Sequence, residues 1–231
     1  MMIRLGRILR SVVTAAALIV TVSAAGQTHY KPHISVGGHG GVAISRMSFS
    51  PEVPQSWIIG PNIGVHARYA EERLVGIVAE LNFVQRGWKE NFEDDPSLSY
   101  SRTLTYITLP IMTHINFGSD RFRFVFNLGP EFGIMIGNSI SSNFDYTNPG
   151  DLLPSTRRYH QMSMDIKNIF DYGITAGFGM EYYLSPRNSV SVEARFYYGL
   201  GNIFPSSKSD EFGASRSMSI GVTAGYSFRL K

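Results

Sequence analysis

Residues 189–198 read SVSVEARFYY, and small or charged side chains alternate in them with apolar ones. Successive side chains of a β-strand point to opposite faces, so Val190, Val192 and Phe196 share one face while Glu193 and Arg195 share the other. This two-residue period is typical of a strand with one apolar and one polar face, and it predicts a β-structure for this stretch.

The same alternation recurs along the chain. In residues 74–86, Val75, Ile77 and Leu81 oppose Glu80 and Arg86. The eight alternating stretches are residues 33–45, 58–69, 74–86, 102–117, 124–136, 172–182, 189–198 and 217–228. The fourth is the least regular, because Thr103, Thr105 and Thr113 fall on its otherwise apolar face.

The connections between these stretches are by turns short and long. The short ones are residues 70–73, 118–121 and 185–188, and the long ones are residues 46–56, 88–102, 138–168 and 201–215. An up-and-down barrel of eight antiparallel strands, with tight turns at one end and large loops at the other, has this rhythm.

The polar face distinguishes a membrane barrel from a soluble one such as a lipocalin, which turns its apolar face inward. That face is rich in Gly, Ser, Thr and Asn, and only five lysines occur in the whole chain. It also carries charges of both signs: Glu80, Glu131, Glu181, Glu193, Arg86, Arg195 and Arg229. Small side chains and opposite charges suit a narrow lumen. We therefore expect a transmembrane barrel with its apolar face toward lipid and its charges paired inside.

Aromatic residues near the ends of the stretches agree with this orientation, because aromatic rings favour the interface between lipid and water. Those toward the long loops are Trp57, Trp88, Phe170, Tyr172 and Tyr198, and those toward the short turns are Tyr69, Phe117, Phe122, Tyr182 and Phe228.

The N-terminus has the pattern of a secretory signal peptide. Arg4, Arg7 and Arg10 precede the apolar residues 12–22, and small residues at 23–25 supply a cleavage site. The alternative, an anchor helix, would need about 20 apolar residues. We predict a signal peptide over residues 1–26, cleaved after Ala25 or Gly26, and an outer-membrane barrel domain over residues 27–231.

Charge and cysteine content exclude several functions. Without the three arginines of the signal peptide, the 21 basic residues fall to 18 and equal the 18 acidic ones, so no basic surface for nucleic acid is expected. The chain has no cysteine, which excludes a disulfide framework, a thiol nucleophile and a lipid-anchored cysteine.

Several short motifs resemble a known family. They are residues 80–87 (ELNFVQRG), 109–111 (LPI), 129–133 (GPEFG), 177–181 (GFGME), 195–203 (RFYYGLGNI) and 225–228 (GYSF). The chain resembles, over residues 33–228, the PorT-like family of outer-membrane β-barrel proteins (porin-family small barrels). The resemblance implies the barrel fold and, through the family's namesake, an association with protein secretion. Residues 229–231 extend past Phe228, where many outer-membrane barrels end on an aromatic residue.

Candidate chemistry is sparse. His39, His66 and His114 share the inward parity, and imidazole is a common metal ligand, so the alternatives are a lumen metal site and hydrogen-bonded lumen histidines; the second is the better interpretation. A lipid-modifying enzyme would need a nucleophile beside a base. The loop 138–168 contains His160, Ser163 and Asp165, but their closeness in sequence does not define a catalytic geometry. We predict no catalytic residues, no cofactor and no metal.

The inward charges are expected to form ion pairs, because an eight-stranded barrel has room only for side chains and not for an open pore. Pro61, Pro110 and Pro130 interrupt predicted strands, and each is expected to mark a bulge or a local opening in the wall.

The sequence thus predicts a monomeric outer-membrane barrel, in contact with outer-membrane lipid, with a structural or interaction role through its long extracellular loops. Residues 138–168 form the longest loop and are the best candidate surface for another protein, with Arg157, Arg158 and Tyr159 as the first residues to substitute. The alternatives are an outer-membrane lipid-modifying enzyme and a secretion-associated, PorT-like subunit.

Overall fold

The computed structural model describes residues 32–70, 74–93, 95–154, 157, 159–206 and 212–230. The predicted signal peptide, residues 1–26, lies outside the described residues, so its assignment stays a prediction. No helix among the described residues has the length and hydropathy needed to cross a membrane.

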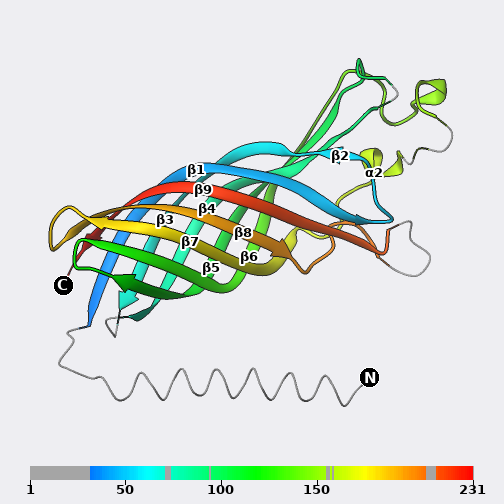
Figure 1. Ribbon diagram of the computed structural model, residues 1–231. Coiled ribbons are helices and arrows are strands. Elements are labelled where there is room, and N and C mark those ends of the chain that lie inside the picture. Colours follow the sequence, from blue (N-terminus) through cyan, green and yellow to red (C-terminus); the bar gives the residue numbers. More distant parts are fainter. Residues whose placement is uncertain are drawn as a thin grey trace, which may run out of the picture. The chain divides into compact units, whose positions relative to one another are not determined.

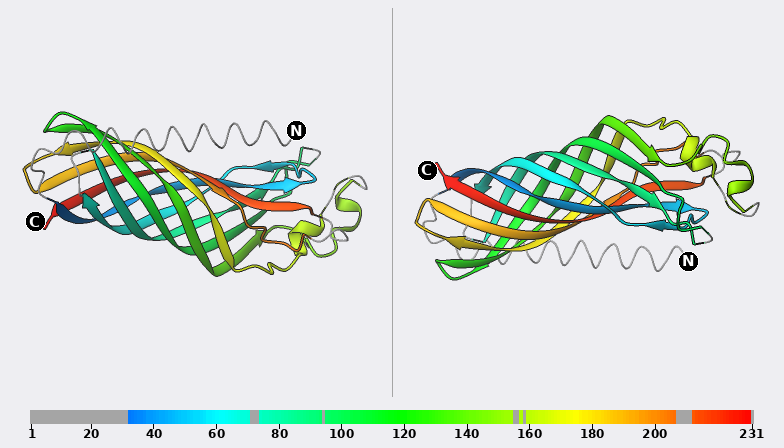
Figure 2. Two further views of the ribbon diagram at one scale, coloured as in Figure 1. Left: turned by 90° about the horizontal axis from the view of Figure 1, so that it is seen from below. Right: turned by 90° about the horizontal axis from the view of Figure 1, so that it is seen from above.

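Eight long strands and one short strand form a single antiparallel sheet that closes on itself (Figures 1 and 2). The strands are β1 (His33–Ser50), β2 (Gln55–Ser56), β3 (Ile58–Ala70), β4 (Val75–Glu90), β5 (Tyr100–Gly118), β6 (Phe122–Ser142), β7 (Phe170–Tyr183), β8 (Asn188–Gly199) and β9 (Ala214–Arg229). Each long strand pairs with its neighbours in sequence, and β1 pairs with β9 to complete the ring. The predicted eight-stranded up-and-down barrel is confirmed.

The strands extend further toward the long loops than the alternation predicts. Strand β6 continues to Ser142, because Tyr100 of β5 still pairs with it there. The first five residues of the predicted loop 138–168 therefore belong to a strand, and the connection itself spans residues 143–169. It contains two short helical segments, η2 (Gly150–Leu152) and α2 (His160–Ser163).

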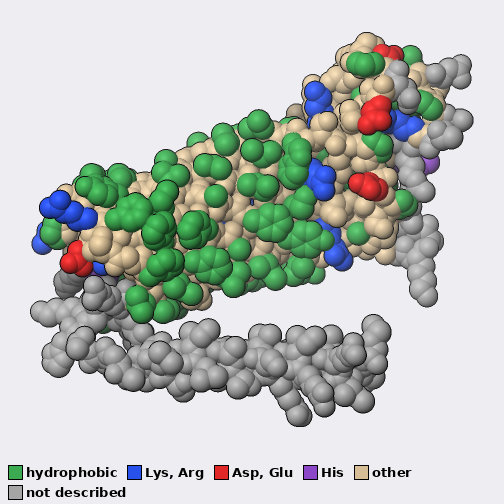
Figure 3. Space-filling view, viewed as in Figure 1, with side chains coloured by type: hydrophobic (Ala, Val, Ile, Leu, Met, Phe, Trp, Pro, Cys, Tyr) green, Lys and Arg blue, Asp and Glu red, His purple; other side chains and the backbone are tan. Residues whose placement is uncertain are grey.

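The apolar face points outward, as predicted. Ile63, Val65, Ile77 and Leu81 are each more than half exposed, whereas Glu80 between two of them is 6% exposed. Figure 3 shows hydrophobic side chains over the wall of the barrel, with lysine and arginine side chains toward its two ends. Such a belt is stable only against lipid, because an exposed apolar surface of this extent would drive aggregation in water.

The predicted interfacial aromatics point outward, with one exception. Trp57 near the long loops is 43% exposed and Tyr182 near the short turns is 45% exposed, but Trp88 is fully buried. The assignment of Trp88 to the interface was wrong, because an even-numbered residue of β4 shares the inward parity of Arg86.

At each of the three prolines, the strand keeps its pairing with one neighbouring strand and loses it with the other. Each proline pairs with a neighbouring strand on one side: Pro61 with Val42, Pro110 with Glu131 and Pro130 with Ile174. On the other side, the prolines have no paired residue. The β3–β4 ladder ends at Asn62, next to Pro61. The β4–β5 ladder is interrupted at Pro110, and the β5–β6 ladder is interrupted at Pro130. The ladders resume in unchanged register beyond Pro110 and Pro130, so these two are local openings and not bulges. A missing N–H at each proline accounts for the gap.

Candidate functional site

The interior of the barrel has two levels, and the level nearer the short turns holds buried ion pairs. Arg195 donates to Glu80 at 2.6 and 3.0 Å and to Glu193 at 2.6 Å. Arg68 forms a two-pronged pair with Glu181 at 2.8 and 3.0 Å. Opposite charges this close satisfy one another where water is scarce, so these pairs hold several strands together through the lumen.

A third pair, Arg86 with Glu131, lies next to Tyr197, whose ring centroid is 3.9 Å from the Arg86 guanidinium carbon. All four predicted glutamates therefore meet an arginine, which confirms the expectation of paired lumen charges. Arg229, in contrast, lies 6.0 Å from the ring of Tyr183 and pairs with no glutamate among the described residues. Sequence reasoning missed Arg68, although its parity with His66 in β3 could have placed it inside.

Two of the three lumen histidines form side-chain hydrogen bonds, as expected, whereas the buried Nε2 of His39 has no hydrogen-bond partner among the described residues. His66 Nε2 lies 2.8 Å from Ser227 Oγ, and His114 Nδ1 lies 2.8 Å from Asn127 Oδ1. His39 stacks on His66 with ring centroids 5.9 Å apart. Within the described residues, no three His, Cys, Asp or Glu side chains are grouped so as to hold a metal ion.

Little free space remains between these side chains. Two lumen cavities have volumes of about 40 Å³ and 20 Å³. Each has room for water molecules but not for an organic solute.

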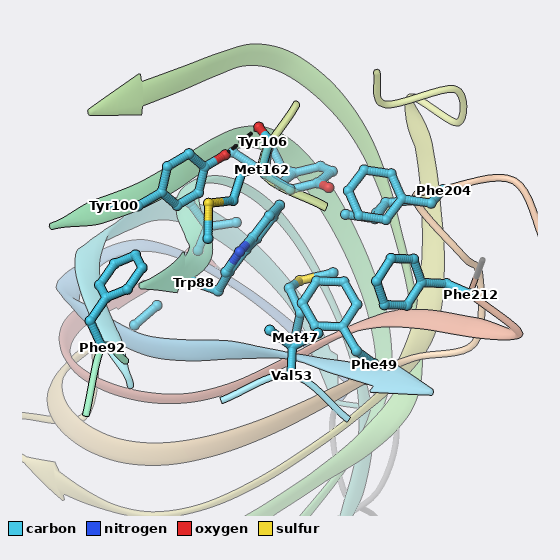
Figure 4. Packing of buried hydrophobic residues seen from close by; sticks show 14 of the residues in the cluster. Met47, Phe49, Val53, Trp88, Phe92, Tyr100, Tyr106, Met162, Phe204 and Phe212 are labelled. Carbon is cyan, nitrogen blue, oxygen red and sulfur yellow. Dashed lines mark hydrogen bonds between the residues drawn. The ribbon is translucent and has the colours of Figure 1, made fainter. Parts of the chain in front are cut away.

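The level nearer the long loops is mainly apolar, a filling that the alternation alone did not predict. Trp88 lies at its centre, with the ring of Phe49 at 5.5 Å and that of Phe204 at 6.2 Å between centroids, both at near-perpendicular angles (Figure 4). Around it pack Met47, Tyr100, Leu104, Tyr106, Met162 and Phe212, all 0 or 1% exposed. Edge-to-face aromatic contacts and complete burial make this a hydrophobic core inside the barrel mouth.

Two long connections supply part of this core. We call the described residues of connections 143–169 and 200–213 the cap. Met162 of α2 inserts from the first connection, and Phe204 and Phe212 insert from the second. Sequence parity could have placed the apolar residues of β4 and β5 inside, but nothing in the alternation showed that the loops fold back onto them.

Hydrogen bonds fasten the cap to the wall. The Tyr100 hydroxyl donates to the Met162 carbonyl at 2.6 Å, and Arg102 donates to the Met164 carbonyl at 2.7 Å. Glu90, fully buried, accepts from Arg157 at 3.1 Å. Each satisfies a polar group that the core would otherwise leave unpaired.

The residues singled out in this loop have different surroundings. The Arg157 side chain is 9% exposed and contacts the ring of Phe92, so it supports the cap from within. Tyr159 is half-buried against the core, and Arg158 lies outside the described residues. The Ser163 hydroxyl donates to the backbone carbonyl of His160.

Local hydrogen bonds order the start of the connection 143–169, where it leaves β6. Asp145 accepts hydrogen bonds from the hydroxyl and the backbone N–H of Thr147 at 2.6 and 3.0 Å. These bonds stabilise the carboxylate and lower the pKa of Asp145 below its usual range. This Asx turn shows that the connection is folded where it leaves the barrel.

Comparisons with known proteins agree with this architecture. Residues 26–205 match the family model described as outer membrane protein beta-barrel domain. No curated protein matches the chain.

Among solved structures, the chain is similar to the outer membrane protein OprG from Pseudomonas aeruginosa, with a TM-score of 0.54, 10% sequence identity, and coverage of 87% of this chain and 97% of that one. A major outer membrane protein from Thermus thermophilus gives a TM-score of 0.47 at 11% identity, covering 87% of this chain and all of that one (100%). At these identities the likeness concerns the fold alone. Since the family model covers most of the chain and the strands close into a ring with a lipid-facing belt, this chain belongs to the outer membrane protein beta-barrel domain family and resides in the outer membrane.

Proposed function

We propose that this protein is a closed, monomeric barrel that neither catalyses a reaction nor conducts solutes, and that it binds another protein through the cap. One observation carries the proposal: the barrel interior is filled, by ion pairs at one level and by an aromatic core with inserted loops at the other. A barrel filled in this way works through its outer surface.

The cap is the part of that surface best suited to a partner. In an outer-membrane barrel the long connections face the outside of the cell. Folded loops on a rigid barrel present a fixed surface at low entropic cost of binding. Leu152 in η2 is 54% exposed, and Leu200 at the start of the second connection is 42% exposed. Exposed apolar side chains on an ordered loop favour protein contact.

The two alternatives make different demands on the structure. A lipid-modifying enzyme needs a nucleophile and a base in reach of lipid, and the lipid-facing Thr105 hydroxyl instead accepts a hydrogen bond from Gln85. A secretion-associated role, suggested by the PorT-like resemblance, is compatible with a protein-binding cap. In that case the partner of the cap would be a component of the secretion machinery.

Site-specific photo-crosslinking in intact cells tests the proposal. A photoreactive residue at Leu152 should yield one dominant protein adduct, whereas the same residue at Ser119 in a short turn at the opposite end should not. The absence of any adduct from cap positions, or release of acyl chains from outer-membrane lipid by the purified barrel, would contradict the proposal. Retention of exported proteins in the periplasm of a deletion strain would assign the partner to secretion.

A further inference from the structure

A second site lies at the short-turn end, away from the cap. A cavity of about 600 Å³ opens there between the turn that joins β5 to β6 and the turn that joins β7 to β8. Its lining includes Arg121, Arg123, Arg229, Tyr182, Tyr183 and Leu184. It is much larger than the cavities inside the lumen.

The ring of Tyr183 contacts two of the three arginines, Arg123 and Arg229. The guanidinium carbon of Arg123 lies 5.0 Å from the ring centroid and that of Arg229 lies 6.0 Å from it. The Tyr183 hydroxyl donates to Glu181 at 3.3 Å, and its backbone N–H donates to the Arg121 carbonyl at 2.9 Å. Tyr183, fixed by these two bonds, thus holds Arg123 of β6 and Arg229 of β9 against its ring. Arg121 lies two positions before Arg123, in the turn that precedes β6.

These arginines carry positive charge that the described side chains do not neutralise. Arg68, Arg86 and Arg195 each pair with a carboxylate inside the lumen. In the described part of the chain, no carboxylate lies within salt-bridge distance of the guanidinium groups that line this cavity.

The donors of these arginines are also incompletely used. Arg123 donates to Asn116 at 3.1 Å, and the buried Nε of Arg229 has no hydrogen-bond acceptor among the residues that the structure describes. Asp120 is the acidic residue in the lining, so the cavity has an excess of cations. A cavity with free guanidinium donors favours an anion with several oxygens, because the planar fork matches phosphate geometry.

The cavity borders the apolar belt, which indicates that the ligand of this site has an apolar part besides its anionic group. Tyr182 is 45% exposed and Leu184 is 60% exposed, and Tyr182 belongs to the outward, lipid-facing set of β7. The cavity therefore joins a cationic interior to the edge of the apolar belt. In an outer-membrane barrel the short turns face the periplasm, so this edge lies at the headgroups of the periplasmic leaflet.

From these contacts we propose that the cavity binds the phosphate group of a phospholipid from the periplasmic leaflet, with the acyl chains against Tyr182 and Leu184. The arginines hold the phosphate oxygens, and the lipid joins the two turns. This lipid site is independent of the cap and of the partner proposed for it.

Native mass spectrometry of the detergent-solubilised full-length protein tests the site with phosphatidylglycerol as the probe. Charge-assisted hydrogen bonds are strong, so R121Q/R229Q should weaken binding by about tenfold or more. The matched control is R46Q/R216Q, which removes two arginines at the opposite end and should leave this binding unchanged. The circular-dichroism spectrum verifies that each variant is folded.

Two further probes separate the sources of the phosphate. Diacylglycerol with the same chains lacks the phosphate and should not bind, and glycerol phosphate lacks the chains and should bind more weakly than the lipid. L184N keeps all three arginines and should weaken phosphatidylglycerol binding while leaving glycerol phosphate binding unchanged. Equal retention of phosphatidylglycerol by R121Q/R229Q and the wild type would overturn the site, and equal affinity for glycerol phosphate would overturn its assignment to a lipid.

Discussion

At the scale of single residues, parity decides between lipid and lumen. The chain has two tryptophans, and the structure places them in opposite environments. Trp57 is 43% exposed on the outer wall, whereas Trp88 is fully buried in the aromatic core. Both lie near the long loops, so distance from the strand end alone predicts the wrong environment for Trp88.

Substitution of the two tryptophans should therefore have unequal effects. Trp88→Ala leaves a cavity in a packed core and should lower the free energy of unfolding by about 3–5 kcal/mol. Trp57→Ala removes a lipid-facing ring and should cost clearly less. Urea-induced unfolding in lipid vesicles measures both. Equal losses would show that the long-loop end is not packed around Trp88.

The lumen charges also act at the scale of single residues, because a buried charge destabilises the fold when its partner is removed. Arg68→Met leaves Glu181 without its two-pronged partner and should lower the free energy of unfolding by about 3–5 kcal/mol. Arg68→Met/Glu181→Gln removes both charges and should recover a large part of that loss. The same unfolding experiment checks the cycle, and a double variant no more stable than the single one would contradict the pairing.

At the scale of strands, the alternation predicts which residues face lipid, and the structure confirms it for every long strand. It predicts the ends of strands less well, because β4, β5 and β6 continue beyond the apolar belt, where the outward face is polar. The ion pairs could be predicted as a group but not partner by partner, since Glu80 and Arg195 lie 115 positions apart in sequence.

Substitutions to and from proline test the strand pairing. Pro110 stands at a gap in the β4–β5 ladder, so Pro110→Ala removes no ladder hydrogen bond and should change the free energy of unfolding by less than about 1 kcal/mol. Ala176 pairs with Leu128 on one side and Phe196 on the other, so Ala176→Pro should cost about 3 kcal/mol or more. A large loss for Pro110→Ala would mean that the gap is not a relaxed opening.

At the scale of the whole molecule, the sequence predicts paired charges inside the barrel, and the structure adds an aromatic core that fills the lumen toward the long loops. The cap could not be predicted from the sequence, because its contacts, such as Tyr100 with Met162, join residues 62 positions apart through a loop without periodicity. The fold and compartment follow from local pattern, whereas the filling of the mouth depends on tertiary contacts.

The filled interior is the central claim, and single-channel recording in planar lipid bilayers tests it most directly. With the lumen occupied by ion pairs and the mouth by the aromatic core, the purified wild-type barrel should show no stepwise current at either polarity. Reproducible open-channel steps from the folded protein would contradict the account, because they would require a continuous water-filled path that the packed side chains exclude.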